Sequence, residues 1–217
     1  MKIFETIREA LQDKEVKIVL PEGEEPRILQ ATKRLVNETS ITPVLLGNPE
    51  KIRIYLEIES VTDGYEVIDP QNCSCFEEMV AAFVERRKGK ITEDEARKLL
   101  KEDVNYFGVM LVYLGKVQGM VSGAVHSTAS TVRPALQIIK TLPWVSRTSG
   151  AFLMVRDDER YVFSDCAINI DPDAKTLAEI AINSALTAQI FGIDPKVAML
   201  SYSTKGSGFG EKVDKVV

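Results

Sequence analysis

Cysteine and histidine are scarce in this sequence, which limits the disulfide and metal chemistry open to it. Three cysteines and one histidine occur among 217 residues, and an odd, sparse cysteine count does not predict a disulfide framework. Cys73 and Cys75 have the spacing of a short metal or redox motif. A closed zinc site is not expected, because there is one histidine and no second cysteine pair. We therefore expect buried or half-exposed thiols, Cys166 included, and no bound metal.

Long apolar runs are also missing, and so is an excess of positive charge. No stretch approaches the length of a membrane span, and residues 1–10 are amphipathic, so no signal peptide is visible. The net charge is −5 and the isoelectric point is about 5.2. General binders of nucleic acid or anionic membranes need a basic face. We therefore expect a cytoplasmic protein with no nucleic-acid or membrane partner, although a locally basic pocket can still bind a small anion.

The rest of the composition is that of an ordinary globular protein, with 45% hydrophobic and 27% charged residues. The length suits one large domain or two modest ones. Segments of helical length alternate with apolar segments of strand length, which favours a mostly parallel sheet covered by helices on both faces. The expected strands are residues 16–20, 41–46, 66–68, 117–121, 151–155, 161–163 and 197–200.

A domain crossover is indicated around Thr141–Trp144. We predict a first α/β domain at residues 1–141 and the start of a second at 142–217. The last residues, Glu211–Val217, would form only about two turns of helix after a strand and a glycine-rich loop. Because a parallel strand needs a crossover and a partner strand, we expect the second domain to be incomplete at its C-terminus.

A polar loop, Ser122–Pro134, follows the predicted strand at 117–121 and opens a helix predicted at 131–140, whose first turn suits Pro134. Ligands of parallel α/β sheets bind beyond the carboxyl ends of the strands. Free backbone N–H groups and the dipole at a helix start favour an anion, and Arg133 adds a planar charged fork suited to phosphate. The loop hydroxyls are those of Ser122, Ser127, Thr128, Ser130 and Thr131.

The alternative for this loop is simple: serine and threonine are ordinary loop and N-cap residues, and Arg133 forms only a surface salt bridge. The number of polar residues directly after a strand favours the anion site.

A second polar loop, 201–210, follows the predicted strand at 197–200 and precedes a helix that begins at Glu211. Hydroxyls, a lysine and glycines of this kind cradle phosphates in other proteins. The loop matches neither the Walker motif, because Lys205 precedes Gly206, nor the dinucleotide fingerprint. A flexible turn is the alternative. The candidate residues are Ser201, Ser203, Thr204, Lys205 and Gly206.

Other polar residues are weaker candidates. Adjacent side chains rarely face each other, so we expect His126 to orient the first loop rather than to act as a base for Ser127. Asp165 follows a predicted strand, where catalytic groups collect, but aspartates in that position also cap turns. Arg27 and the pair Arg86–Arg87 are further cations that chemistry alone does not separate from solvated helix faces.

Two long motifs resemble those of phosphate acetyltransferases. Residues 121–141, VSGAVHSTASTVRPALQIIKT, are similar to the central motif of that family, and residues 196–207, KVAMLSYSTKGS, to its second motif. Residues 20–27, LPEGEEPR, and residues 163–165, FSD, also match, so the resemblance covers the whole chain. Phosphate butyryltransferases are near relatives, so the resemblance indicates the reaction type more firmly than the acyl length.

The resemblance implies two α/β domains with mostly parallel sheets, as in isocitrate and isopropylmalate dehydrogenases. It places the active site in the cleft between them, usually in a homodimer. The implied reaction moves an acetyl group between coenzyme A (CoA), a co-substrate, and inorganic phosphate, giving acetyl phosphate. No metal takes part: the CoA thiolate attacks the acyl carbonyl, while cations hold the phosphoryl group and offset charge in the tetrahedral transition state.

Residue roles follow from the resemblance by motif position. Arg133 would bind the phosphate, and Arg87 and Arg27 would bind substrate or CoA. Ser127 and the loop Ser203–Gly206 should line the cleft.

In this family the chain continues well past the last residue of this sequence. The omitted part completes the second domain and returns to the first. It also supplies a serine–arginine pair that faces the reacting carbonyl and an aspartate proposed to deprotonate the CoA thiol. A family cysteine near the cleft has no counterpart between Gly150 and Tyr161. Because a thiol with a pKa of about 8.5 needs a proton acceptor, we assign no catalytic residue and do not expect these 217 residues to be active alone.

Several functional hypotheses remain. The first is a phosphate acetyltransferase chain, with a phosphate butyryltransferase-like enzyme as its variant. The second is a non-catalytic ligand-binding fragment of the same scaffold, favoured by the absent C-terminal part. A decarboxylating dehydrogenase shares the two-domain architecture but is disfavoured, because the sequence has neither a dinucleotide fingerprint nor a clustered acidic metal site.

Overall fold

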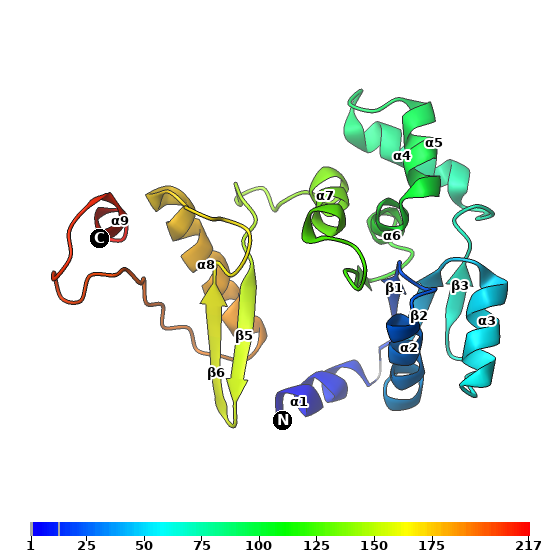
Figure 1. The fold of residues 1–217 in the computed structure, drawn as a ribbon, viewed down its shortest axis with the longest axis horizontal. Helices are drawn as coiled ribbons and strands as arrows, with labels where there is room; N and C mark the ends of the chain where they lie inside the picture. Colours follow the sequence, from blue (N-terminus) through cyan, green and yellow to red (C-terminus); the bar gives the residue numbers. More distant parts are fainter. Residues whose placement is uncertain (1, 13) are drawn as a thin grey trace. The chain divides into compact units, whose positions relative to one another are not determined.

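The structure is a computed structural model that describes residues 2–12 and 14–217 (Figure 1). The chain forms two compact units. One consists of residues 6–140, and the other of residues 141–217 together with the start of the chain. An amphipathic helix, α1 (Lys2–Leu11), begins the chain.

The first unit contains a four-stranded parallel sheet in the order β3-β2-β1-β4. Three of its strands have the predicted bounds. The fourth is shorter than predicted, because its ladder with β1 covers only two residue pairs, although backbone bonds from Gln118 to Lys17 and from Val121 to Val19 continue along β1. The strands are β1 (Val16–Leu20), β2 (Ile41–Leu46), β3 (Glu66–Ile68) and β4 (Gly119–Met120).

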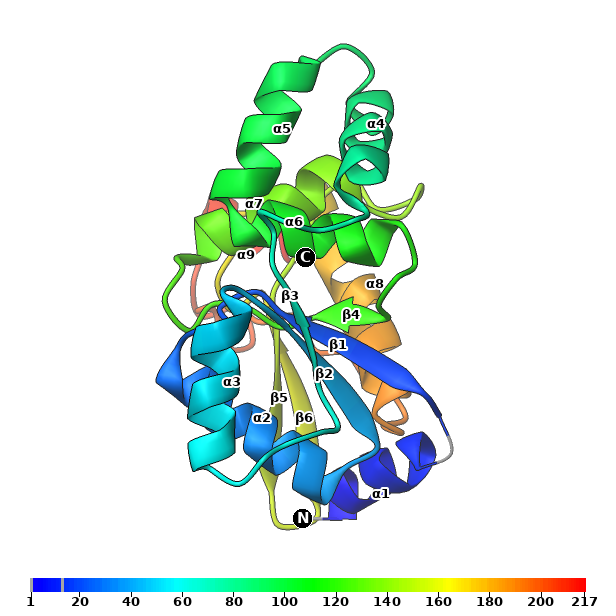
Figure 2. The same cartoon turned by 90° about the vertical axis from the view of Figure 1, so that its right-hand side faces the viewer.

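Alternate residues of these strands enter two separate cores, as the two-residue period of a strand requires. Val19 packs in one core with α4, α5, α6 and α7, whereas Leu20 packs in the other with α2 and α3. Figure 2 shows α3 and α6 on opposite sides of the sheet. Both cores consist of fully buried aliphatic and aromatic side chains. The predicted covering of the sheet by helices on both faces is therefore confirmed for this unit.

The helices of the first unit start where capping residues allow. They are α2 (Pro26–Glu38), α3 (Pro49–Ile58), α4 (Phe76–Arg87), α5 (Glu93–Glu102), α6 (Val104–Tyr113) and α7 (Thr128–Ile138). Thr92 and Glu95 form a capping box at the start of α5. Helix α7 begins three residues earlier than predicted, because Ser127 caps it. Pro134 therefore lies inside the helix, where a proline leaves one carbonyl without its N–H partner.

The second unit contains an antiparallel hairpin of β5 (Ala151–Arg156) and β6 (Glu159–Ser164), then α8 (Ala174–Ile190) and a short α9 (Glu211–Asp214). The strand predicted at 197–200 is not formed. Strands need a hydrogen-bonded neighbour, and the described residues of this unit provide none, so Leu200 is 85% exposed. The expectation of a mostly parallel sheet is thus met in the first unit only.

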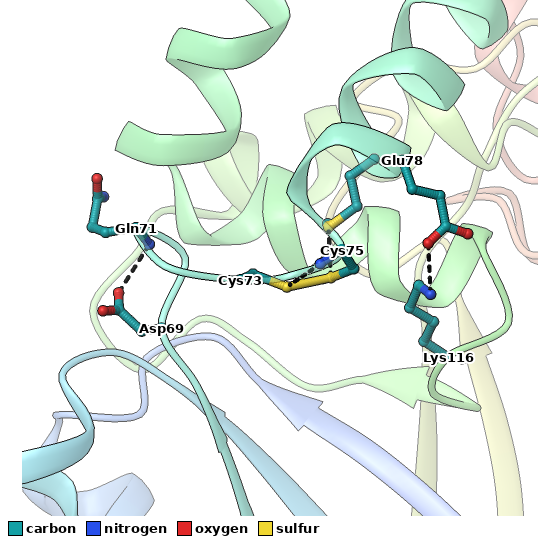
Figure 3. The surroundings of a disulfide bond; sticks show 7 residues. Asp69, Gln71, Cys73, Cys75, Glu78 and Lys116 are labelled. Atoms are coloured by element: carbon teal, nitrogen blue, oxygen red, sulfur yellow. Dashed lines mark hydrogen bonds and ion pairs between the residues drawn. A yellow bond between two sulfur atoms is a disulfide. The ribbon is translucent and has the colours of Figure 1, made fainter.

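The cysteines correct one prediction. Cys73 and Cys75 form a disulfide in the segment that leads from β3 into α4 (Figure 3). The turn there places their Cα atoms 5.3 Å apart, within the usual range for a disulfide. Spacing alone did not reveal this geometry. Cys166 is a free, half-buried thiol, as predicted.

Candidate functional site

The first unit has a topological switch point between β1 and β4. Strands β2 and β3 extend the sheet on one side of β1, and β4 lies on the other side. In open parallel sheets, ligands bind beyond the carboxyl ends of the two strands that flank such a reversal. Two loops meet this description: residues 21–25 after β1 and residues 121–127 after β4.

Glu22, in the loop after β1, is a buried carboxylate that binds the other loop. Its side chain is 1% exposed. Oε2 accepts hydrogen bonds from the backbone N–H groups of Gly123 (3.0 Å) and Ala124 (2.7 Å). Oε1 accepts from the N–H groups of Val125 (2.8 Å) and His126 (2.9 Å), and lies 2.7 Å from His126 Nδ1. One carboxylate therefore holds four consecutive N–H groups and an imidazole.

These contacts leave the N–H groups of residues 123–126 unavailable to an external anion. Burial raises the pKa of Glu22, but the hydrogen bonds from the Val125 N–H, the His126 side chain and the Ala124 N–H outweigh it. The pKa falls from 4.5 to about 2. Glu22 is therefore ionised at neutral pH, and residues 123–126 face an internal anion.

Arg27, at the start of α2, bridges the same two loops. Its Nη2 donates to the carbonyl oxygen of Ala124 (2.7 Å), and its Nε donates to Glu25 Oε1 (2.6 Å). The structure thus brings Arg27 to the switch point, where its side chain is 65% exposed. There it supports the loop backbone.

Hydroxyl groups gather at the start of α7. Ser127 Oγ accepts a hydrogen bond from the N–H of Ser130 (3.3 Å), and Ser130 Oγ donates to the Ser127 carbonyl (2.9 Å). Thr128 is exposed in the first turn, where the first N–H groups of a helix have no intrahelical partner. Donors for an anion therefore remain at the helix start, directly after the four N–H groups that Glu22 binds.

Two buried polar atoms flank the loop without a hydrogen-bond partner among the described residues. Ser122 Oγ donates to Oδ1 of the fully buried Asn105 (2.6 Å), whose Nδ2 is unpartnered. Thr131 Oγ1 is the other such atom, and it is 4.0 Å from where a Cβ on Gly123 would lie. Because buried polar groups are normally hydrogen-bonded, we expect a water or a ligand oxygen beside each.

Arg133 lies exposed on α7, and in the described part of the chain no hydrogen bond or ion pair holds its guanidinium. Nearby, the hydroxyl of Tyr106 donates to Gln137 Oε1 (2.9 Å). Burial and then the charge of Asp103 raise the pKa of Tyr106, whereas the charges of Arg133 and Arg87 act to lower it. Both arginines are therefore within electrostatic reach of the same phenol.

Arg87 ends α4 beside the end of α7. Its Nη1 donates to the Gln137 carbonyl (3.4 Å), while Arg86 donates to the carbonyls of Ile138 (2.6 Å) and Ile139 (2.9 Å). Cations near the last carbonyls of a helix are favourable. These contacts place two guanidinium groups at the C-terminal end of the helix that begins at Ser127.

Further cations surround this point. We call them the basic cluster: Arg86, Arg87, Lys88, Lys90 and Lys140. The charge of Arg86, then burial, then the charges of the other three lower the pKa of Lys140. No ion pair to a carboxylate is formed by any member within residues 2–12 and 14–217. The cluster is therefore a patch of uncompensated positive charge on a protein of net charge −5.

The second polar loop belongs to the other unit, and its contacts are internal. The Ser201 hydroxyl accepts from the N–H of Ser203 (3.1 Å), and the Ser203 hydroxyl accepts from that of Gly208 (3.1 Å). The N–H of Thr204 donates to the hydroxyl of Ser207 (2.9 Å). The serines thus form a tight turn that is held by its own hydrogen bonds.

Lys205 and Gly206 form the exposed tip of that turn, with φ angles of 51° and 83°. Lys205 has no side-chain partner among the described residues. Within the first unit, Arg27 contacts the loop after β4, Arg87 contacts the end of α7, and Arg133 lies between these points on α7. Ser201–Gly206 form a separate turn in the other unit.

Asp165, at the end of β6, caps a turn. It accepts hydrogen bonds from the N–H groups of Gly150 (3.2 Å), Ala167 (2.9 Å), Ile168 (3.0 Å) and Asn169 (2.8 Å). Burial raises its pKa, but the hydrogen bonds from the N–H groups of Ile168, Ala167 and Asn169 and from the Asn169 side chain outweigh it and hold the pKa well below its usual 3.8. The turn-capping interpretation of this residue is confirmed.

The second unit also contains an apolar pocket of about 760 Å³ beside β6, α8 and residues 193–200. Sequence analysis did not anticipate it, because residues 197–200 were predicted to form a strand inside a sheet. Its apolar lining includes Phe152, Val162, Leu177, Ile180, Val197 and Met199. Several of these side chains are exposed, with Phe152 at 56% and Val197 at 53%.

Among residues 2–12 and 14–217, no helix is long and apolar enough to cross a membrane. In the same part of the chain, no three or more His, Cys, Asp or Glu side chains are placed to hold a metal ion.

Comparisons with known proteins give one consistent result. Residues 2–217 match the family model described as phosphate acetyl/butaryl transferase. The chain is 53% identical over 215 residues to the phosphate acetyltransferase of Bacillus subtilis and 54% identical to that of Staphylococcus epidermidis. These matches cover 99% of this chain but 66% and 65% of the two relatives.

Solved structures agree. A phosphotransacetylase from Streptococcus pyogenes superposes with a TM-score of 0.93 at 56% identity, over 99% of this chain and 66% of its own. The EutD phosphotransacetylase from Staphylococcus aureus gives a TM-score of 0.89 at 51% identity, over 100% of this chain and 66% of its own. The chain thus spans about two thirds of the length of the relatives that it matches.

Proposed function

Because the chain belongs to the phosphate acetyl/butaryl transferase family, we propose that it provides the substrate-binding part of a phosphate acetyltransferase. Such an enzyme moves an acetyl group reversibly between CoA and inorganic phosphate. The two curated relatives described above both carry the name phosphate acetyltransferase.

The observation that carries the proposal is the free guanidinium of Arg133 on α7, the helix that begins in the hydroxyl-rich segment 127–131. Had a carboxylate held Arg133, the surface salt-bridge alternative would have applied. Instead the guanidinium of Arg133 is unpaired. Two backbone N–H groups in the first turn of α7 and the hydroxyl of Thr128 are also available, and the helix starts near a topological switch point. This set of donors suits the phosphoryl group of acetyl phosphate.

Each group has a role in the proposed chemistry. Arg133 and the start of α7 hold the phosphate, which is the nucleophile in one direction and the leaving group in the other. The unpartnered hydroxyl of Thr131 and the unpartnered Nδ2 of Asn105, whose Oδ1 accepts from Ser122, supply further donors close by. Positive charge placed there also offsets the negative charge that develops on the acyl oxygen in the tetrahedral transition state.

CoA carries several phosphates, and the basic cluster is the proposed site for that end of the co-substrate. Arg87 belongs to the cluster and lies within electrostatic reach of Tyr106 together with Arg133. Helix α7 therefore connects a site for the reacting phosphate near its middle and start to a site for an anionic nucleotide at its end. Arg27 is proposed to act at the first of these sites, through the loop that it supports.

The proposal extends to the second unit. Residues 1–141 and 142–217 are taken as parts of two α/β domains arranged as in isocitrate and isopropylmalate dehydrogenases. The turn that contains Ser201, Ser203, Thr204, Lys205 and Gly206 is proposed as a further substrate-binding segment of the second domain.

We propose that a polypeptide equivalent to the part of the relatives that this chain does not match is a necessary partner. It would cover the apolar pocket and the exposed side chains of the second unit, and supply the proton acceptor and carbonyl-facing residues that the chain lacks. A homodimer and a cytoplasmic location belong to the same proposal.

Binding measurements on Arg133→Ala test the proposal. The variant is expected to weaken the binding of inorganic phosphate by about ten- to a hundredfold, because a charge-assisted hydrogen bond is lost. CoA affinity should change much less. Isothermal titration of each ligand into the chain gives both values, with Arg53→Ala, an exposed arginine on α3, as the control. Equal losses for both ligands would show that Arg133 is misassigned.

A butyryl-specific enzyme is the second candidate, because the family description names both acyl groups. With the remaining third of a relative supplied, initial rates with acetyl phosphate and butyryl phosphate separate the two. Faster thioester formation from butyryl phosphate would favour this candidate.

A further inference from the structure

Glu22 is a buried charge that the proposed reaction does not use. A carboxylate removed from water is unfavourable unless hydrogen bonds or opposite charges replace the solvent. No lysine or arginine pairs with it among the described residues. Its partners are instead four backbone N–H groups and one imidazole, all from residues 123–126, about one hundred positions further along the chain.

Four N–H groups that converge on one carboxylate determine the path of the backbone that carries them. Gly123 turns the chain at the beginning of this path with a φ of 112°, a value that other residues rarely adopt. Directly after His126 comes Ser127, the N-cap of α7. The segment that Glu22 binds therefore leads directly into α7.

We propose that Glu22 is a positioning residue, which holds residues 123–126 in one conformation and thereby presents the start of α7, with Ser127, Thr128 and Arg133, to a phosphate group. The identity of the ligand rests on the proposed function, whereas the role of Glu22 in holding the loop does not depend on it.

Electrostatics distinguishes a positioning role for Glu22 from the absence of one. Glu22 carries a negative charge close to a proposed anion site, and by Coulomb's law that charge alone opposes phosphate binding. If Glu22 had no positioning role, replacing it with glutamine would strengthen phosphate binding. If Glu22 positions the loop, the same replacement weakens binding, because an amide has one acceptor oxygen and directs N–H groups at backbone N–H groups. The two cases predict changes of opposite sign.

His126 adds a spectroscopic signature. An ionised carboxylate only accepts hydrogen bonds, so the Nδ1 atom that faces Glu22 must carry a proton. His126 is the sole histidine of the chain, and its ring nitrogens therefore give unobscured 15N signals. The neutral ring should be the Nδ1–H tautomer in the wild type, and that preference should be lost in Glu22→Gln.

The experiment compares Glu22→Gln with Glu24→Gln in the chain as it stands. Glu24 is matched in charge and lies two residues away. It binds a different segment, accepting from the Asn48 N–H (2.8 Å) and from Lys51 Nζ (3.1 Å). Glu22→Gln should accelerate amide exchange at residues 123–126 at least about tenfold, with unchanged exchange in the core. It should also weaken the binding of inorganic phosphate about tenfold or more. Glu24→Gln should do neither.

Gly123→Ala provides a second route to the same answer if Glu22→Gln does not fold. An added Cβ meets no atom closer than 4.0 Å, so the substitution strains the backbone at positive φ without a clash. It should loosen the loop and weaken phosphate binding while Glu22 stays intact.

The outcomes are distinct. Unchanged exchange at residues 123–126 in Glu22→Gln would overturn the inference, and so would stronger phosphate binding by that variant. A wild-type chain that binds no phosphate would instead contradict the proposed function, and the exchange data would still show whether Glu22 holds the loop.

Discussion

At the scale of single residues, two carboxylates act in the same way. Glu22 follows β1 and Asp165 follows β6, and each collects four backbone N–H groups from nearby turns. In both cases burial opposes ionisation, and the sum of the hydrogen bonds outweighs it. These acids therefore shape the backbone and are poorly suited to act as bases at neutral pH.

Stability should depend on pH through Glu22. Its pKa is lowered from 4.5 to about 2 in the folded chain, so folding is favoured by its ionised form. That contribution is complete above pH 4.5 and is lost as the pH falls towards 2. The shift corresponds to about 3 kcal/mol. Urea unfolding at several pH values between 6 and 2.5 should show the loss.

The control for this dependence is Glu22→Gln, whose unfolding free energy should fall less over the same pH interval. Other carboxylates with lowered pKa values, Asp165 among them, contribute to both proteins and cancel in the difference. Identical pH profiles would mean that Glu22 does not titrate as the structure indicates.

At the scale of elements, α7 connects the two parts of the proposed substrate site. It starts at a serine cap beside the switch point, carries Arg133 in its middle, and ends where Arg86 and Arg87 donate to its last carbonyls. An anion at the start and cations at the end both suit the helix dipole. Electrostatic interactions at both ends therefore favour this orientation of the helix, in addition to packing.

Ser127→Asp should separate the capping role of Ser127 from its proximity to the ligand. Aspartate is as good an N-cap as serine, so the free energy of unfolding should stay within about 0.5 kcal/mol of the wild type. The added negative charge should nevertheless weaken the binding of inorganic phosphate more than about tenfold. Chemical denaturation and calorimetric titration provide the two values.

Thr92→Asp is the matched control, because Thr92 caps α5 by the same hydrogen bond to an N3 backbone N–H. It should leave phosphate binding nearly unchanged, whereas stability should fall, because an aspartate cannot donate to Glu95 Oε2 as the Thr92 hydroxyl does. If Ser127→Asp bound phosphate as well as Thr92→Asp does, the start of α7 would not be the anion site.

At the scale of the whole molecule, the two units differ in how completely their apolar surfaces are covered. The sheet of residues 6–140 has a core on each face. In residues 141–217, Leu200 and Phe209 are each 85% exposed, and an apolar pocket lies beside the hairpin. Exposed apolar area of this extent commonly marks a surface that contacts other polypeptide.

The complete reaction should therefore require additional polypeptide. The 217-residue chain with acetyl phosphate and CoA is expected to form no thioester above the uncatalysed rate. Mixing it with the part of the Streptococcus pyogenes relative that it does not match should produce thioester, followed by its ultraviolet absorbance. The isolated part of the relative is the control, and robust turnover by the chain alone would contradict the prediction.

The sequence by itself determined what depends on local pattern and local chemistry. Three strands of the parallel sheet and the places of the two hairpin strands were predicted from the pattern of apolar residues, which acts between near neighbours in the chain. The hydroxyl-rich segment before Arg133 and the family membership were recognisable for the same reason.

Only the tertiary structure decided how distant segments meet. Three glutamates, Glu22, Glu24 and Glu25, stand within four positions, and nothing in their spacing shows which one becomes buried against residues 123–126. The disulfide of Cys73 and the lost strand at 197–200 depended on turn geometry and on the absence of a pairing neighbour among the described residues. Hydrogen bonds and burial between remote segments carry no periodic signal along a chain, so they become visible only once the strands are placed side by side.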